Sequence, residues 1–296
     1  MSLLQTLRFV TGHPLNRRQR AAAVLRYAKW QLGGRLVPGK VIHDWIGGAK
    51  IVVRPGDTGL TGNIYCGLHE FPEMAYVLHV LAADDLFADI GANAGSYTVL
   101  ACAVKGARGI CFEPVPATFA RLMENIRVND LTARVEARNI GLSDEAGALN
   151  FTSLEDCTNH VMAAGEQTAG AISVPTLPLD QVLGGRVPAV IKMDVEGFET
   201  PVLRGARATL ANPALHSVIM ELNGSGTRYG FDEAEILRTM LGHGFSTYAY
   251  EPFARRLEPL GGKNAASGNT LFIRDRDLVA GRIGKCGPIA FGRVTF

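Results

Sequence analysis

The stretch that decides the fold reads Leu86-Phe-Ala-Asp-Ile-Gly-Ala-Asn-Ala-Gly95, a short apolar run that enters a glycine-rich turn. Gly91 and Gly95 allow the backbone to turn tightly and let a ligand approach where a Cβ would clash. The spacing is Gly-x-x-x-Gly, not the Gly-x-Gly-x-x-Gly of dinucleotide-binding folds, which disfavours a nucleotide-dependent oxidoreductase. Asp89 precedes the glycines, where a carboxylate would repel a pyrophosphate. The turn therefore favours a ligand that carries a cationic group.

A second carboxylate ends the next predicted strand, 109–112. Glu113 follows that strand directly, where a carboxylate can accept hydrogen bonds from both hydroxyls of a ribose. A cationic amino-acid group near Asp89 and a ribose on Glu113 together describe S-adenosylmethionine. The alternative is a plain strand–turn–helix unit whose two acids are merely solvated.

Strands and helices alternate downstream of this turn. The apolar patterns predict strands over 86–90, 109–112, 133–142, 187–194 and 216–222, and helices over 96–104, 116–128, 200–210 and 232–241. Further strands are expected over 148–152, 245–250 and 269–274. This alternation predicts a mostly parallel α/β sheet with helices on both faces, whose strands present their carboxyl ends at one rim. Ligands of such sheets bind at that rim.

The segment before the sheet has a different pattern. Helical spacing runs over 1–32 with a break at Pro14, and Gly33-Gly34 is predicted to end the helix. A β-hairpin over 40–54, a glycine-rich loop over 56–67 and a helix from Pro72 to about residue 82 follow. We expect an N-terminal basic helical segment and hairpin over 1–64, a central domain over 65–276 and a C-terminal tail over 277–296.

Four blocks of the central domain resemble the FkbM family of methyltransferases. They are Asp89-Ile-Gly-Ala-Asn-Ala-Gly-Ser-Tyr-Thr98, Phe112-Glu-Pro-Val-Pro116, Gly141-Leu-Ser-Asp144 and Lys192-Met-Asp-Val-Glu-Gly-Phe-Glu199. The resemblance covers about residues 65–275 and keeps the order and spacing of all four. It implies a class I methyltransferase (Rossmann-like) fold, with a seven-stranded sheet that has one antiparallel strand near an edge. It also implies methyl transfer from S-adenosylmethionine, mainly to hydroxyls of sugars, glycolipids and secondary metabolites.

The resemblance also implies a set of cofactor-binding residues. Asn139 and Ser143 are alternatives, because either residue could lie near the adenine. Tyr97 either caps the cofactor or packs in the core. The implied residues are Asp89, Gly91, Asn93 and Gly95 for the methionine and ribose portions, Glu113 for the ribose hydroxyls, Pro114 for the adenine edge, and Asn139 or Ser143 near the adenine.

Three ionisable side chains end the apolar strand predicted over 187–194. Lys192, Asp194 and Glu196 lie two residues apart, so they share one face if the strand stays extended to 196. One interpretation is a structural network in which Lys192 neutralises a carboxylate and Glu196 caps the next helix. The other is catalytic: Asp194, or Glu196 as the next choice, orients the acceptor hydroxyl or takes its proton. The resemblance favours the catalytic role for Asp194.

Other polar residues are weaker candidates. His160 lies in the segment between the third and fourth predicted strands and is either an alternative base or a surface residue. Glu221 and Asn223 follow the fifth strand and could bind Mg²⁺ together with Asp194, although no metal is required by the resemblance and none is predicted. His69, Glu70 and Glu73 precede the central domain's first strand, where an N-terminal segment could close over the cofactor.

The net charge of +2 conceals a division of the chain. Residues 1–40 hold eight basic side chains and no acidic one, whereas residues 41–296 hold 22 basic and 28 acidic side chains. This basic segment could be a helix packed on the body with a solvated arginine face, an attachment site for an anionic membrane surface, or a nucleic-acid contact. Nucleic acid is disfavoured, because the chain lacks the Asn/Asp-Pro-Pro-Tyr motif of base-amine methyltransferases.

The five cysteines are scattered and form no Cys-x-x-Cys pair, which favours reduced thiols. No run of about 20 apolar residues and no secretory signal pattern is present. We therefore expect a cytoplasmic protein, with possible peripheral attachment at the inner membrane face through residues 1–40. The acceptor is expected to be a small molecule or a glycan. The alternative function is a non-catalytic cofactor-binding module that is docked to a membrane or a protein through its basic helix.

Overall fold

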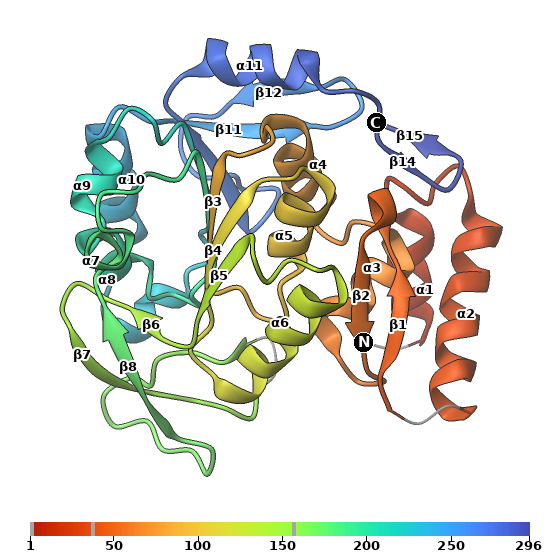
Figure 1. Ribbon diagram of the computed structural model, residues 1–296, viewed down its shortest axis with the longest axis horizontal. Helices are drawn as coiled ribbons and strands as arrows, with labels where there is room; N and C mark the ends of the chain where they lie inside the picture. The colour runs from red at the N-terminus through yellow and green to blue at the C-terminus, as the bar shows by residue number, and fades with distance from the viewer. Residues whose placement is uncertain (1–2, 37–38, 156–157) are drawn as a thin grey trace.

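The computed structural model describes residues 3–36, 39–155 and 158–296 (Figure 1). Its centre is an eight-stranded sheet in the order β12-β11-β13-β10-β9-β3-β4-β5. The five strands from β10 to β5 are parallel, while β13 runs antiparallel to both of its neighbours. The bounds are β3 (Leu86–Ile90), β4 (Arg108–Phe112), β5 (Val135–Arg138), β9 (Val190–Met193), β10 (Ser217–Glu221), β11 (Ser246–Glu251), β12 (Arg256–Pro259) and β13 (Asn269–Ile273).

This arrangement is the predicted class I methyltransferase (Rossmann-like) fold. Seven strands follow the expected pattern with one antiparallel strand near the edge, and β12 is an additional eighth strand that forms a hairpin with β11. The parallel strands bring their carboxyl ends to one rim, as expected. The fold therefore places the ends of β3, β4 and β9 side by side.

Helices cover both faces of the sheet (Figure 1). On one face lie α4 (Phe71–Val80), α5 (Ser96–Val99), which continues as a π-helical turn over Leu100–Val104, α6 (Pro116–Val128) and α11 (Arg276–Lys285). On the other face lie α7 (Leu179–Leu183), α8 (Glu199–Arg204), α9 (Arg207–Ala211) and α10 (Glu233–Gly242). Successive residues of each strand point to opposite faces, so Phe87 joins one apolar core and Ala88 the other.

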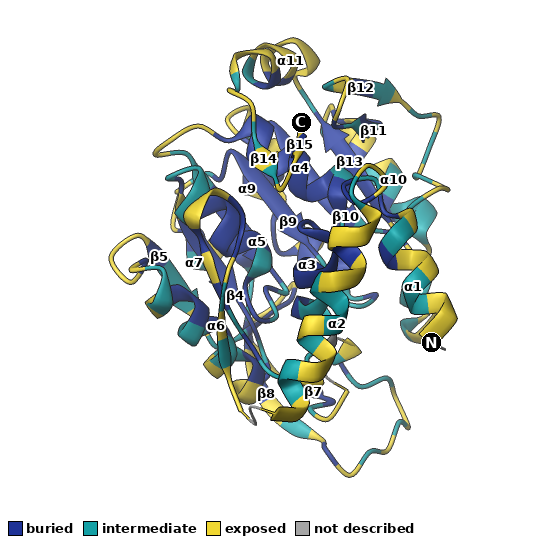
Figure 2. Ribbon diagram, turned by 90° about the vertical axis from the view of Figure 1, so that its right-hand side faces the viewer, coloured by how far each residue is buried: buried dark blue, intermediate teal, exposed yellow. Residues whose placement is uncertain are grey.

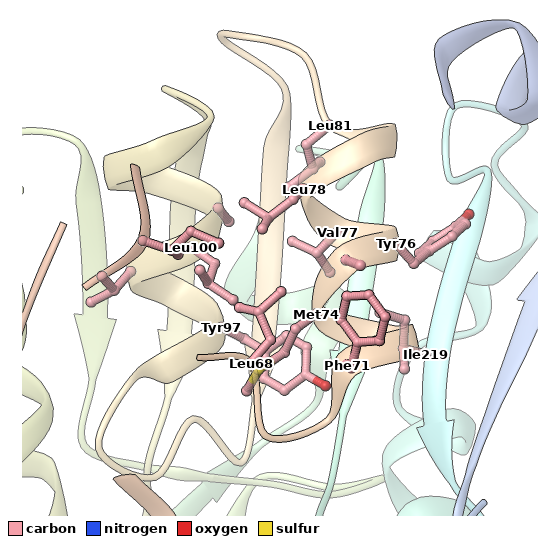
Figure 3. Close-up of a cluster of buried hydrophobic side chains, with 14 of the residues drawn as sticks. Leu68, Phe71, Met74, Tyr76, Val77, Leu78, Leu81, Tyr97, Leu100 and Ile219 are labelled. Atoms are coloured by element: carbon pink, nitrogen blue, oxygen red, sulfur yellow. The ribbon is translucent and has the colours of Figure 1, made fainter. Parts of the chain in front are cut away.

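The larger core is built around α4. Figure 3 shows Phe71, Met74 and Leu78 of this helix packed between the sheet residue Ile219 and Leu100 of the neighbouring helix. All three side chains of α4 are at most 2% exposed. This packing fixes the start of α4, and the loop before it, next to the rim.

The predicted third strand, 133–142, is wrong in its extent. The backbone leaves the main sheet after Arg138, and residues Gly141–Leu142 form β6 of a separate three-stranded sheet with β8 (Ile172–Leu177) and β7 (Gly147–Phe151). The side chain of Asn139 makes the corner, because its amide donates to the backbone oxygens of Glu113 and Pro114 at 2.8 and 2.9 Å. The small sheet stands beside the rim rather than within the main sheet.

Three helices also differ from the prediction. Residues of the predicted glycine loop form α3 (Thr58–Cys66). Helix α2 (Arg20–Leu36) continues through Gly33-Gly34, where a Cβ on Gly34 would lie 3.1 Å from Pro55. The predicted helix 200–210 is divided into α8 and α9 at Gly205, whose Cβ would lie 2.1 Å from the backbone oxygen of Ser143. In the last two cases glycine permits close packing.

The C-terminal hairpin packs beside the N-terminal segment, with Gln19 Nε2 donating to the Phe291 backbone oxygen at 3.3 Å, whereas the two termini themselves lie apart (Figure 1). The N-terminal segment contains α1 (Leu3–Gly12), α2 and the predicted hairpin, β1 (Val41–Asp44) and β2 (Lys50–Val53). The C-terminal hairpin of β14 (Ala290–Phe291) and β15 (Val294–Thr295) leads to Phe296, whose ring lies 5.1 Å from that of Phe71. Among the described residues, no helix has both the length and the apolar content needed to cross a bilayer.

Candidate active site

The glycine-rich turn brings the ends of β3 and β9 into direct contact. Gly91 has φ +78°, and a Cβ added to it would lie 1.8 Å from the backbone oxygen of Asp194. Only glycine permits this approach. Asn93 also has a positive φ of +47°, and its side-chain oxygen accepts a hydrogen bond from the Ala94 N–H at 2.6 Å. The turn is therefore held in one shape at the rim.

A cavity of about 330 Å³ opens at this turn. Its walls come from α3, the loop before α4, the turn after β3, and the ends of β4, β9 and β10. The lining residues are Gly59, Leu60, His69, Glu70, Asp89, Gly91, Ala92, Asn93, Ala94, Ser96, Tyr97, Glu113, Asn159, Lys192, Asp194, Glu196 and Glu221. Six of the eight residues predicted for catalysis or for the methionine and ribose portions thus share one cleft with Glu113.

Gly95 is one of the two exceptions, since it does not line the cleft. A Cβ there would lie 2.5 Å from Leu122 Cδ1, so this glycine makes room for packing by α6. The function of Gly95 in this structure is to let α5 and α6 approach each other.

Glu113 is held rigidly with its carboxylate in the cleft. Its Oε2 accepts the Asn93 N–H and its Oε1 accepts the Val115 N–H, both at 3.0 Å. Burial raises the pKa of Glu113 to about 7, although these two N–H groups lower it. A carboxylate oxygen has two lone pairs, so each oxygen can still accept a hydroxyl. Glu113 therefore keeps one accepting position on each of its two carboxylate oxygens.

Asp89 is almost fully buried at the base of the cleft. Its Oδ2 accepts the backbone N–H and the hydroxyl of Thr98 at 2.9 and 2.6 Å, which fixes the first turn of α5. Burial raises the pKa of Asp89 to about 6, while the Thr98 hydroxyl and the charge of Lys192 lower it. Asp89 thus has a structural role as well as a place in the cleft lining.

A second, apolar cavity adjoins the first at Gly91 and Asp194. It has a volume of about 50 Å³ and lies between the main sheet and the small sheet. Its lining is Ile90, Gly91, Phe112, Pro114, Ile140, Gly141, Leu142, Phe151, Val161, Asp194, Val195 and Phe198. Pro114, the residue predicted for the adenine edge, lines this cavity, whereas neither Asn139 nor Ser143 does. Asn139 is engaged by backbone oxygens, and the Ser143 hydroxyl donates to Asp144 at 3.0 Å.

Lys192 and Asp194 form an ion pair at the end of β9. Lys192 is only 2% exposed, and its Nζ donates to Asp194 Oδ2 at 3.2 Å. Burial by itself would lower the pKa of Lys192, but the carboxylates of Asp194, Glu70 and Glu221 outweigh burial and raise it. Lys192 is therefore a permanent cation beneath the cleft.

Glu196 reaches the same place by a different route from the predicted one. The strand ends at Met193, and Glu196 has φ +53°, so 192–196 is not a continuous extended segment. The carboxylates of Asp194, Glu196 and Glu221 nevertheless lie within 4.8 Å of one another. Burial, followed by the charge of Asp194, raises the pKa of both Glu196 and Glu221. Glu196 does not cap the next helix, because no side chain caps the start of α8; Glu199, at its first position, accepts the Gly197 N–H of the preceding turn at 3.3 Å.

Three clustered carboxylates do not by themselves establish a metal site, because acidic groups also gather without an ion. Asn223, the amide considered as a fourth ligand, is exposed and its side-chain oxygen accepts the Ser225 N–H at 2.9 Å. The positive charge that the structure places beside the cluster is Lys192.

Asn269 and Glu70 complete this network, and Asn269 was not among the predicted site residues. Asn269 opens strand β13; its Oδ1 accepts from Lys192 Nζ at 3.1 Å, and its amide donates to Glu70 at 2.7 Å. Glu70 also accepts the Tyr97 hydroxyl at 3.0 Å, and the Lys192 Nζ lies 5.4 Å from the Tyr97 ring. Glu73 lies behind, with the Ser267 hydroxyl donating to it at 3.0 Å. The signal available in the sequence was the amide side chain of Asn269 at the start of an apolar strand.

His160 does not line either cavity. It is 8% exposed, its Nε2 lies 3.0 Å from Glu166 Oε1, and its Nδ1 lies 2.9 Å from the Thr158 backbone oxygen. Both ring nitrogens are thus engaged within the small-sheet segment. Its neighbour Asn159 lines the cleft instead.

Comparisons with known proteins give a family match. The family model described as "Methyltransferase FkbM domain" matches residues 89–247, more than half of the chain. The chain belongs to the FkbM methyltransferase family. Among its FkbM-like relatives, the hexuronic acid methyltransferase AglP of Haloferax volcanii is 34% identical over 143 residues, which are 47% of this chain and 56% of AglP. Methyltransferase 1 of Beauveria bassiana is 29% identical over 160 residues, 46% of this chain and 64% of that protein.

The matched residues therefore cover less than two thirds of the length of each of these two relatives. Among solved structures, the precorrin-6Y C5,15-methyltransferase of Geobacter metallireducens aligns with a TM-score of 0.40 and 11% identity, covering 69% of this chain and 86% of that one.

Proposed function

We propose that the protein is an S-adenosylmethionine-dependent O-methyltransferase that acts on a hydroxyl of a sugar, a glycolipid or a secondary metabolite. The observation that carries the proposal is the single cleft in which Gly91, Glu113 and Asp194 meet. The similarity to a hexuronic acid methyltransferase supports a sugar acceptor. We assign the catalytic unit to residues 65–276, flanked by 1–64 and 277–296, with Gly59 and Leu60 of the first flanking segment contributing to the cleft wall. The free thiols of Cys66, Cys102, Cys111 and Cys286 support a reducing compartment such as the cytoplasm.

The residues present fit the cofactor. Gly91 has no side chain that would keep a ligand from the backbone of the turn. Glu113 keeps free lone pairs for two ribose hydroxyls. The apolar cavity beside Pro114 suits the edge of an adenine ring. When bound, S-adenosylmethionine supplies a methyl group on a cationic sulfur, which the acidic lining of the cleft attracts. Glu113 anchors and orients the ribose, and the rigid glycine turn holds the methionine portion.

Asp194 is placed to orient the acceptor. Its side chain is 34% exposed, so a hydroxyl entering the cleft can donate to it, while Lys192 holds one of its oxygens. Methyl transfer is an in-line displacement, so orientation supplies much of the rate acceleration. The acceptor oxygen would lose its proton to the carboxylate of Asp194 as it gains the methyl group. Glu196 is the second candidate to receive the proton, because a carboxylate with a raised pKa is the better base near neutral pH.

Isothermal titration with S-adenosylmethionine tests the cofactor assignment. The wild type should bind, and Glu113→Ala should bind at least about tenfold more weakly, since a buried acceptor for ribose is lost. The matched control Glu258→Gln lies on β12, far along the sheet from β4, and should bind like the wild type. No binding by the wild type would refute the proposal.

Transfer of the methyl group to a panel of sugars and glycolipids tests catalysis. Asp194→Asn should reduce kcat by about a hundredfold or more with the cofactor Kd nearly unchanged, whereas Asp277→Asn, on the exposed face of α11, should match the wild type. Equal loss of both activity and cofactor affinity would support a structural role for Asp194. Cofactor binding without turnover on any acceptor would favour the non-catalytic module.

A further inference from the structure

Helix α2 exposes its apolar face to solvent. Leu25, Leu32 and Leu36 are 55%, 58% and 81% exposed. They are spaced by seven and four residues, so they lie on one face of the helix. The opposite face packs inward through Ala23, which is fully buried, and Trp30. The stripe of leucines is therefore unpartnered, which is the reverse of the usual orientation of an amphipathic helix.

Helix α1 adds further exposed apolar side chains next to α2. Leu3 and Leu4 are 62% and 70% exposed, and α1 packs beside α2 at the front of the view in Figure 2. Of the twelve large apolar side chains that are exposed in the described residues, eight lie between residues 3 and 42. They are Leu3, Leu4, Phe9, Val24, Leu25, Leu32, Leu36 and Ile42. Single exposed leucines need no explanation, but such a concentration marks a contact surface.

The basic side chains of α2 have no acidic counterpart within this segment. Lys29 lies within the stripe of α2 and Arg35 flanks it, whereas Arg20 lies at the start of the helix, away from the stripe; all three are exposed and form no ion pair with a described residue. Residues 1–40 contain no aspartate or glutamate. Arg26 is the exception among the arginines of α2, because it turns inward and donates to Asn16 and to the Tyr65 backbone oxygen. The surface thus combines apolar side chains with uncompensated positive charge.

We propose that α1 and α2 form a docking surface for a bilayer that contains anionic lipids. A helix with leucines outward and lysine or arginine at its flanks lies in the interface of such a bilayer, with its apolar face among the acyl chains. The long basic side chains reach the headgroups while their stems cover apolar surface. A second copy of the chain fits less well, since a two-fold interface would bring the same basic residues face to face with no carboxylate from this segment to pair with them.

The position of the surface connects it to the cleft. Helix α2 packs against α3, whose Gly59 and Leu60 line the cleft. A docked molecule would therefore hold the cleft close to the membrane surface, where an acceptor linked to a lipid could enter. This last consequence rests on the proposed function, whereas the docking surface itself does not.

Co-sedimentation of the full chain with vesicles tests the proposal. The wild type should sediment with vesicles of phosphatidylcholine mixed with phosphatidylglycerol and remain in solution with pure phosphatidylcholine, and added salt should weaken binding. The triple variant Leu25→Gln/Leu32→Gln/Leu36→Gln should bind at least about tenfold more weakly. The matched control Leu241→Gln, on α10, removes a leucine that is 53% exposed outside the surface and should bind like the wild type.

Several outcomes overturn the proposal. They are no binding of the wild type to the anionic vesicles, equal binding by the triple variant, or equal binding to neutral vesicles. Sedimentation velocity could instead show a wild-type dimer that the triple variant does not form, with no binding to vesicles. That result would assign the surface to a second copy of the chain and would also overturn the proposal. Titration with S-adenosylmethionine and circular dichroism show whether each variant is folded. Because vesicle binding is measured without cofactor, failure of the proposed function leaves this result unaffected.

Discussion

Replacing Lys192 by methionine removes the cation beneath the cleft and so measures its contribution to stability. Methionine has a similar length and apolar stem, so the change removes the charge and two hydrogen bonds, to Asp194 and Asn269, without a large cavity. Removal of one partner from a buried ion pair costs about 3–5 kcal/mol in the free energy of unfolding. The Asp194 side chain is 34% exposed, and water screens it in part, so we expect a loss of about 2–3 kcal/mol.

This loss should depend on pH. Burial, together with the charge of Asp194, already raises the pKa of Glu196 and Glu221, and Lys192 opposes that rise. Without the lysine these pKa values rise further above those of the unfolded chain. A carboxyl group with a raised pKa in the folded state binds more protons there than in the unfolded state, so its contribution improves as the pH falls. The variant should therefore lose more stability at about pH 8 than at about pH 5.5.

Urea denaturation followed by circular dichroism at both pH values measures these differences. The matched control is Lys263→Met, because the Lys263 Nζ pairs with Glu233 but its side chain is 42% exposed. An exposed pair contributes only about 0–1 kcal/mol. A Lys192→Met loss no larger than that of the control, or an equal loss at both pH values, would refute the reasoning about the buried cation.

Three further predictions concern the cleft. Because burial raises the pKa of Glu113 to about 7, the affinity for S-adenosylmethionine should fall as the pH drops below that value, and titration of Glu113→Gln should show a shallower dependence near pH 7, since Asp89 still titrates in the cleft; an unchanged slope would contradict this. Gly91→Ala places a Cβ 1.8 Å from the Asp194 oxygen and should cost about 2–4 kcal/mol of stability in thermal melts, against about 1 kcal/mol for Gly184→Ala, whose Cβ meets open space. Asn269→Ala should lower kcat about tenfold with little change in the cofactor Kd, since its amide positions the buried lysine; a selective loss of cofactor affinity would count against that role.

The central sheet and most of the cleft could be predicted from local sequence. The apolar run that contains Asp89 and ends at Gly91 fixes a strand and its turn. Glu113 follows the next strand directly, so it must lie at the same rim. Parallel strands with right-handed crossovers leave no other arrangement. The predicted adenine contacts at Asn139 and Ser143 depended on where the third strand ends, and that boundary is set by hydrogen bonds from Asn139 to another loop.

The contribution of β13 to the cleft could not be predicted. Asn269 is 77 residues from Lys192 in the chain, and no local pattern pairs them. Their contact arises because β13 returns antiparallel beside β10, which brings the first residue of β13 to the rim where the parallel strands end. Glu70 reaches the same network only because α4 packs on the sheet.

The sequence by itself determined the α/β fold, the glycine turn with its two carboxylates, and the division between a basic first segment and an acidic body. These features depend on residue type and spacing along the chain, which act locally. Position in the sequence already placed Asp194, Glu196 and Glu221 at one rim, but tertiary structure alone decided that Lys192 is buried beneath these carboxylates and that the leucines of α2 face solvent. A helical pattern specifies which residues share a face, but the direction of that face is set by what packs against the helix, and here Ala23 and Trp30 occupy the inner side.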